Sequence, residues 1–214
     1  TNTTTCSGNS VNLTASGATS YSWNTGAITN TISVAPTGNT TYSVTGTNSV
    51  GCTNTKTVSV TVNPSPTVAV NNASVCSGST VALIASGANS YVWNTTATTP
   101  SITVFTTNTN TYSVIGSNTF GCTNVKTATV TVLASPTLAV SNATICSGSS
   151  TNLTASGATT YSWNTGATTN SVSVTPTINT TYSVTGTTTG CTNTKTVTVT
   201  VNALPTTAVA STTI

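Results

Sequence analysis

The chain has 214 residues, with no Asp, no Glu, no His and three Lys, so its net charge is only +3. General acid–base catalysis at neutral pH needs a carboxylate, an imidazole or a tuned lysine, so this composition argues against an enzyme. Three separated lysines make no basic patch for nucleic acid, and no run of about 18 apolar residues could span a membrane. The sequence predicts a structural or binding protein with no catalytic residues, no cofactor and no metal site.

One motif occurs three times along the chain. Its first cysteines are 70 residues apart (76−6 and 146−76). A fixed period of this size indicates a tandem array. The motif contains two cysteines in each copy: Cys6, Cys52, Cys76, Cys122, Cys146 and Cys191. The expected domains are residues 1–64, 65–134 and 135–203, with residues 204–214 as the opening strand of a following domain.

Strand patterns follow one another through the first copy. Apolar and polar residues alternate over residues 11–15, 21–23, 32–34, 42–44 and 58–62. This period of two predicts strands with one apolar face and one Thr/Ser face. Two sheets can bury their apolar faces against each other as an antiparallel sandwich. No segment has the pattern of a helix.

Proline recurs where one copy passes into the next, at Pro66, Pro136 and Pro205. Short proline-bearing linkers are semi-rigid, so we expect the domains to form a rod. The first copy has only residues 1–5 before its first cysteine and lacks the proline-led opening strand of the other copies. Residues from Pro205 onward match that strand. We expect them to lie against a following domain, either in a longer array or in the next subunit of a fibre.

The repeated consensus combines CSGxSVxLTASGAxxYSWNTGA with TYSVTGT and GCTNTKTVTVTV. It resembles immunoglobulin-like repeats of Bacteroidetes surface and secreted proteins, which are related to PKD domains. This resemblance covers nearly the whole chain and implies an all-β fold of three tandem immunoglobulin-like antiparallel β-sandwiches. It also implies an extracellular or cell-surface location and no catalysis. Relatives commonly carry Asp before Gly-Cys, and this chain has no acid there to bind calcium.

Six aromatic residues are candidate core residues: Trp23, Trp93, Trp163, Tyr42, Tyr112 and Tyr182. The tryptophans could stack on sugars, but they share parity with a tyrosine two residues earlier, which favours packing in the sandwich core. Tyr42, Tyr112 and Tyr182 begin the penultimate strand pattern of their copies. We expect them to act as tyrosine corners, with each hydroxyl on the backbone. Ligand binding by these tyrosines is the alternative.

The cysteines are predicted to form disulfides, because a tetrahedral metal site needs closely spaced ligand pairs and the chain has no His. Disulfides indicate an oxidising compartment outside the cytoplasm. Sequence does not determine connectivity. Repetition favours one bond inside each copy, such as Cys6 with Cys52, and a bond between neighbouring copies is the alternative.

Each copy contains one lysine with the parity of the core valines: Lys56, Lys126 and Lys195. We expect each stem to lie along the sandwich rim, with its ammonium in water or over an aromatic face. An Asn–Lys isopeptide crosslink is the alternative, and such crosslinks normally rely on a nearby acid.

These features predict a structural repeat segment of an extracellular filament or cell-surface stalk, stabilised by disulfides. Self-association, head to tail and laterally, is expected because the strands carry few charged side chains that would prevent their edges from pairing with another chain. The alternative is an adhesin or carbohydrate-binding module, which exposed aromatic side chains would support. Glycans are a further candidate partner, and ice binding by flat Thr faces is a weaker hypothesis.

Overall fold

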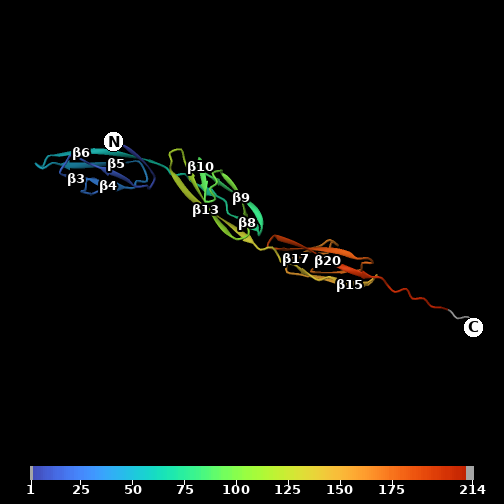
Figure 1. The fold of residues 1–214 in the computed structure, drawn as a ribbon. Coiled ribbons are helices and arrows are strands. Elements are labelled where there is room, and N and C mark those ends of the chain that lie inside the picture. The colour runs from blue at the N-terminus through green and yellow to red at the C-terminus, as the bar shows by residue number, and fades with distance from the viewer. Residues whose placement is uncertain (1, 211–214) are drawn as a thin grey trace, which may run out of the picture. The chain divides into compact units, whose positions relative to one another are not determined.

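The computed structural model describes residues 2–210, and within that range it contains strands and turns but no helix (Figure 1). Consequently, no helix in this range could cross a membrane. The first sandwich consists of β1 (Thr3–Cys6), β2 (Val11–Thr14), β3 (Ser20–Trp23), β4 (Thr31–Val34), β5 (Thr40–Thr47) and β6 (Thr53–Asn63). One sheet has the order β1-β6-β5-β3, and the other pairs β2 with β4.

The second sandwich has seven strands. They are β7 (Ala69–Val70), β8 (Ala73–Cys76), β9 (Ser79–Ser86), β10 (Ser90–Trp93), β11 (Ser101–Thr106), β12 (Asn110–Ser117) and β13 (Thr123–Leu133). One sheet has the order β10-β12-β13-β8, and the other has the order β11-β9-β7. The second sheet thus gains β7, which has no counterpart among the described strands of the first sandwich.

The third sandwich repeats the second. Its strands are β14 (Ala139–Val140), β15 (Ala143–Cys146), β16 (Thr151–Ser156), β17 (Thr160–Trp163), β18 (Ser171–Val174), β19 (Thr180–Thr188) and β20 (Cys191–Asn202). The sheets have the orders β15-β20-β19-β17 and β14-β16-β18.

The strand order identifies these sandwiches as immunoglobulin-like. In the third, the first, third and fifth strands form one sheet, while the fourth, sixth and seventh form the other together with the short β15. The fourth strand carries Trp163, which is only 2% exposed. Immunoglobulin domains place a buried tryptophan on the equivalent strand. The predicted all-β fold of tandem immunoglobulin-like β-sandwiches is confirmed.

Apolar and polar side chains alternate along the strands, and this places the core of each sandwich between its two sheets. In β20, Val197 and Val199 are buried, whereas the threonines between and beside them are exposed. Leu153 and Val184 pack into the same cluster from β16 and β19. Burial of apolar side chains drives this arrangement, and β-branched threonine suits the solvent face of a strand.

A parallel strand pair determines where the first cysteine of each copy lies. β1 runs parallel to β6, and Cys6 is the register partner of Asn63. β15 likewise runs parallel to β20, with Cys146 opposite Asn202. The first cysteine therefore lies beside the last residue of the final strand, immediately before the linker.

By internal contacts the chain divides into two compact units. One contains Thr1–Ala73, Val81–Val104 and Thr111–Val130, and the other contains Ser74–Thr80, Phe105–Asn110 and Thr131–Ile214. The second sandwich contributes residues to both units. Cys6 and Cys122 belong to the first unit, whereas Cys76 and Cys191 belong to the second.

Candidate functional site

Two disulfides join neighbouring copies of the repeat. Cys6 bonds to Cys122 and Cys76 bonds to Cys191, with Cα–Cα distances of 5.5 and 5.6 Å. Within the chain, the prediction that all six cysteines form disulfides is wrong for Cys52 and Cys146, which are free and exposed. The predicted pairing inside one copy is therefore wrong, and the alternative between copies is the one found.

The parallel pairing of β1 with β6 explains this correction. Cys6 lies beside the last residue of β6, whereas Cys52 immediately precedes its first residue. At about 3.3 Å per residue, the 11 residues of β6 place these two cysteines roughly 35 Å apart. A disulfide needs Cα atoms within about 7 Å, so Cys6 and Cys52 of one sandwich cannot bond.

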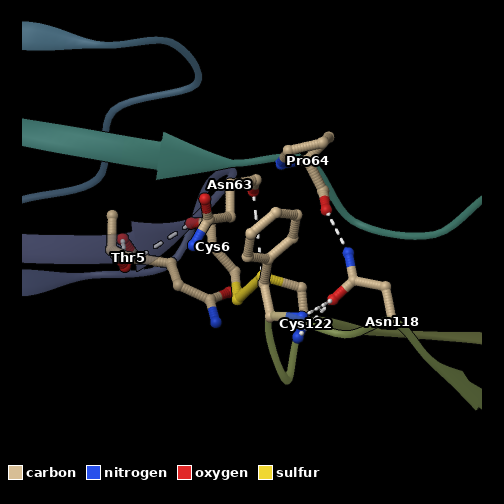
Figure 2. The surroundings of a disulfide bond; sticks show 8 residues. Thr5, Cys6, Asn63, Pro64, Asn118 and Cys122 are labelled. Carbon is tan, nitrogen blue, oxygen red and sulfur yellow. Dashed lines mark hydrogen bonds between the residues drawn. A yellow bond between two sulfur atoms is a disulfide. The ribbon is translucent and has the colours of Figure 1, made fainter.

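The Cys6–Cys122 bond is held beside the linker by an asparagine (Figure 2). Asn118 Oδ1 accepts a hydrogen bond from the Cys122 backbone N–H at 3.0 Å, and Asn118 Nδ2 donates to the Pro64 carbonyl at 2.7 Å. Cys122 Sγ lies 3.8 Å from the Asn63 carbonyl oxygen. Cys122 is fully buried. Asn118 therefore connects the disulfide turn directly to the linker.

Each linker and the disulfide beside it are here called a joint. The second joint, at the Cys76–Cys191 bond, has similar contacts. Cys191 is fully buried, and its Sγ lies 3.9 Å from the Leu133 carbonyl oxygen. Asn193 Nδ2 donates to the Pro136 carbonyl at 2.9 Å. In the first joint the corresponding bond runs from Asn124 Nδ2 to the Pro66 carbonyl at 3.0 Å. Each linker is thus fixed by hydrogen bonds to the copy that follows it.

The residues after each linker fill a slot in the edge of the sandwich that follows. Val68 and Leu138 are buried, with 7% and 5% of their surface exposed. A Cβ atom added to Gly116 would collide with the Val68 side chain, and one added to Gly186 would collide with that of Leu138. The following residues pair as β7 with β9 and as β14 with β16.

The equivalent slot of the first sandwich is open. It is a groove of about 650 Å³ whose lining includes Gly17, Ala18, Gly46 and Cys52. A Cβ added to Gly87 or Gly157 would collide with the carbonyl of Thr67 or Thr137, but one added to Gly17 meets nothing within 4 Å. The groove therefore has the shape that an opening strand fills in the other two sandwiches.

The three tryptophans lie in the sandwich cores. Trp23, Trp93 and Trp163 are 4%, 2% and 2% exposed. Their indole N–H groups donate to the carbonyls of Thr29, Thr99 and Thr169 at 2.8, 2.9 and 3.0 Å. Side chains buried and bonded in this way are not available for stacking on sugars.

The tyrosines differ from the expected tyrosine corners. Tyr42 is buried, while Tyr112 and Tyr182 are half-buried. Among the described residues, the tyrosine hydroxyls that bond to the backbone belong instead to Tyr21, Tyr91 and Tyr161, which contact the N–H and carbonyl of Ala18, Ala88 and Ala158. Each of these tyrosines lies two residues before the core tryptophan. Its fixed distance from the preceding Gly-Ala turn was the available sequence signal.

The lysines are exposed, as their expected rim positions require. Lys195 Nζ donates to the Leu138 carbonyl at 3.5 Å and so contacts the segment that fills the third slot. Within residues 2–210, no group of three or more His, Cys, Asp or Glu side chains is placed to hold a metal ion.

No protein-family model matches the sequence, and no curated protein matches it. Several solved structures of tandem immunoglobulin domains are similar. Domains 3–5 of Drosophila OTK are 8% identical with a TM-score of 0.40, and 94% of each chain is covered. A titin I67–I69 fragment is 11% identical with a TM-score of 0.40, covering 94% of this chain and 96% of that one. The insect immune protein hemolin is 12% identical with a TM-score of 0.36, covering 94% and 74%. These scores are low, so the fold assignment rests on the strand order.

Proposed function

We propose that this chain is a tension-bearing structural segment of an extracellular filament or cell-surface stalk. The observation that carries the proposal is the connectivity of the two disulfides. Each links the first cysteine of one copy to the second cysteine of the next. Consequently, the covalent route along the array does not need to pass through most of each sandwich.

One such route, here called the covalent rail, runs from Cys52 to Cys76, crosses the disulfide to Cys191 and continues to Asn202. It contains 35 backbone steps (76−52 = 24 and 202−191 = 11), whereas the route through the whole chain contains 150 (202−52). The rail consists of β6, the proline-bearing linker, β7, β8 and β20. Residues 77–190 are not part of it.

The covalent rail is already close to its fully extended length. A strand already rises about 3.3 Å per residue, and a fully extended chain reaches at most about 3.6 Å. Pulling on the rail cannot release the residues looped out by the disulfide. Without the two disulfides, unfolding would release about 115 residues (150−35), or roughly 400 Å of chain. The disulfides therefore make the array nearly inextensible.

An extracellular location suits this role, because disulfides persist in oxidising compartments. The resemblance to Bacteroidetes surface repeats favours the same location and a bacterial source. An adhesin or carbohydrate-binding module is less well supported, since all three tryptophans are buried and hydrogen-bonded.

Single-molecule stretching tests this function. Maleimide-linked handles are attached to Cys52 and to a cysteine introduced at Ala210, in a Cys146→Ser background that leaves only these two free thiols. We expect the oxidised chain to show no unfolding steps before a handle detaches. The matched variant carries Cys76→Ser and Cys191→Ser in addition. Because it keeps the Cys6–Cys122 bond, its shortest covalent route from Cys52 to Asn202 has 126 steps (52−6 = 46 and 202−122 = 80), so it should gain 91 steps (126−35), or roughly 330 Å of contour length. Equal extension of the two proteins would contradict the proposed function.

A further inference from the structure

We propose that the open slot of the first sandwich binds residues 203–209 of a second copy of this chain, and that Cys52 then forms a disulfide with Cys146 of that copy. The inference extends the proposed function and rests on it, because this joint would continue the covalent rails from copy to copy. It is carried by the two joints already present within the chain.

The occupant is indicated by what fills the equivalent slots. The second and third slots are filled by the sequences Pro-Thr-Val-Ala-Val (66–70) and Pro-Thr-Leu-Ala-Val (136–140). In both, the proline and the residue two positions later are buried. The same pattern recurs as Pro-Thr-Thr-Ala-Val at 205–209, where every residue is exposed and Val209 is 97% exposed. Within residues 2–210 there are thus one open slot and one exposed segment of the type that fills such slots.

The turn that presents Cys52 already has the hydrogen bonds of the disulfide-bonded turn in the second sandwich. Asn48 Oδ1 accepts from the Cys52 N–H at 2.9 Å, and the Asn48 N–H donates to the Cys52 carbonyl at 3.0 Å. The corresponding distances in the disulfide-bonded turn of Asn118 and Cys122 are both 3.0 Å. Binding therefore requires little rearrangement of the turn that presents Cys52.

Polar groups that would fix the incoming backbone also line the slot. Asn54 and Lys56 both belong to its lining. Their counterparts Asn193 and Lys195 donate to the backbone carbonyls of Pro136 and Leu138. By equivalence, Asn54 would donate to the carbonyl of Pro205, and Lys56 to that of Thr207, in the second copy.

Cys146 has the right relation to this segment. It ends β15 opposite Asn202, as Cys6 ends β1 opposite Asn63. Cys6 reaches Cys122 when the residues after Asn63 fill the second slot. The residues after Asn202 are expected to bring Cys146 to Cys52 in the same way.

Bond formation needs a two-electron acceptor, for which a small-molecule disulfide is sufficient. The thiolate of one cysteine attacks that disulfide, forming a mixed disulfide and releasing one small thiol. The thiolate of the other cysteine then attacks the protein sulfur of the mixed disulfide and releases the second small thiol. Two protein thiols are oxidised to one disulfide, and the small disulfide is reduced to two thiols.

Complementary variants test the joint in a glutathione redox buffer. Cys52→Ser retains the segment and Cys146, whereas Cys146→Ser retains the slot and Cys52. We expect each variant alone to remain monomeric on non-reducing gels, and an equimolar mixture to form a dimer only. Peptide mapping should place the new bond between Cys52 and Cys146. Dimers of either variant alone in similar yield, or no dimer in the mixture, would overturn the proposal.

A second experiment tests the slot without relying on the new bond. In a Cys52→Ser, Cys146→Ser background, association is measured by analytical ultracentrifugation. Thr207→Asp would bury an unpaired charge where Val68 and Leu138 lie, and it should weaken association by roughly tenfold or more. Thr206→Asp is the matched control, because Thr67 and Thr137 are exposed. Thr207→Val should strengthen association by replacing a hydroxyl with a methyl group.

Equal effects of the two aspartate variants would show that the segment does not occupy the slot. The outcome is separable from that of the proposed function, because the stretching experiment uses a single chain with Cys146→Ser. If these copies fail to join while the oxidised single chain remains inextensible, only the joint between copies is disproved.

Discussion

The first and third sandwiches share most of their motif residues but differ along one edge. Cys52 is exposed where its counterpart Cys191 is fully buried, and Val44 is half-buried where Val184 is fully buried. The third sandwich has β14 at this edge, and the first has no described strand there. The second and third sandwiches are therefore each completed by the residues that follow the linker and by a cysteine from the preceding copy, and the first is not.

Thiol accessibility should give the largest difference between equivalent positions. In freshly purified monomer, iodoacetamide should modify Cys52 and Cys146 completely and leave the other four cysteines unmodified. The reason is that two cysteines are free and exposed while four are in disulfides. Intact-mass measurement gives the number of labels, and fragment masses give their positions. Labelling of Cys122 or Cys191 under native conditions would contradict the difference between the sandwiches.

Removing the side chain that fills a slot should destabilise the sandwich containing it. Leu138→Ala should cost about 2–5 kcal/mol, because it leaves a cavity in the third core. Thr207→Ala changes the equivalent position in an exposed segment and should alter stability by less than about 0.5 kcal/mol. Hydrogen exchange in β16 and β19 measures the effect locally. Similar costs for the two variants would mean that the slot filler contributes little.

Replacing equivalent glycines by alanine should distinguish two causes of destabilisation. One is backbone strain, which both positions share, and the other is a collision with the opening strand, which occurs only where that strand is present. Gly17 and Gly157 both have positive φ, 88° and 94°, so alanine pays a left-handed penalty of about 1 kcal/mol at each. At Gly157 the added Cβ also collides with the Thr137 carbonyl. We expect Gly157→Ala to cost about 1–2 kcal/mol more than Gly17→Ala. Local hydrogen exchange in each sandwich checks this, and equal costs would argue against a filled third slot.

Changing the pH should have the smallest effect, and the same effect on all three sandwiches. Acid unfolding mostly reflects protonation of paired carboxylates and of buried neutral histidines, and this chain has no Asp, Glu or His. The melting temperature should therefore remain nearly constant between about pH 3 and pH 8. Calorimetry checks this, and a fall of tens of degrees at pH 3 would contradict the expectation.

Much of the fold could be predicted from the sequence because its determinants are local. Alternation along residues such as 58–62 identified a strand and its buried face, and the position of Trp23 identified a core residue. Cysteine pairing is different, because it depends on which strand ends lie together. Repeat spacing alone did not indicate that β1 runs parallel to β6, and this pairing places Cys6 away from Cys52.

The packing of the opening strand was also difficult to predict from the sequence. The proline-led segments that begin at Pro66 and Pro136 can be recognised in the sequence, but the slots that they fill become visible only from the packing of Val68 and Leu138. The described residues 204–210 of the predicted following-domain strand are exposed and have no strand, and residues 211–214 lie outside the described residues. The assignment of residues 204–214 as an opening strand therefore remains a prediction.

Disulfide mapping of the oxidised chain tests the central claim most directly. The chain is digested under acidic, non-reducing conditions with proteases that cut between all six cysteines, and the linked peptides are identified by mass spectrometry. The bonds between copies predict peptides joining Cys6 to Cys122 and Cys76 to Cys191. Peptides joining Cys6 to Cys52 and Cys76 to Cys122 would contradict the account, because the covalent rail would then not exist.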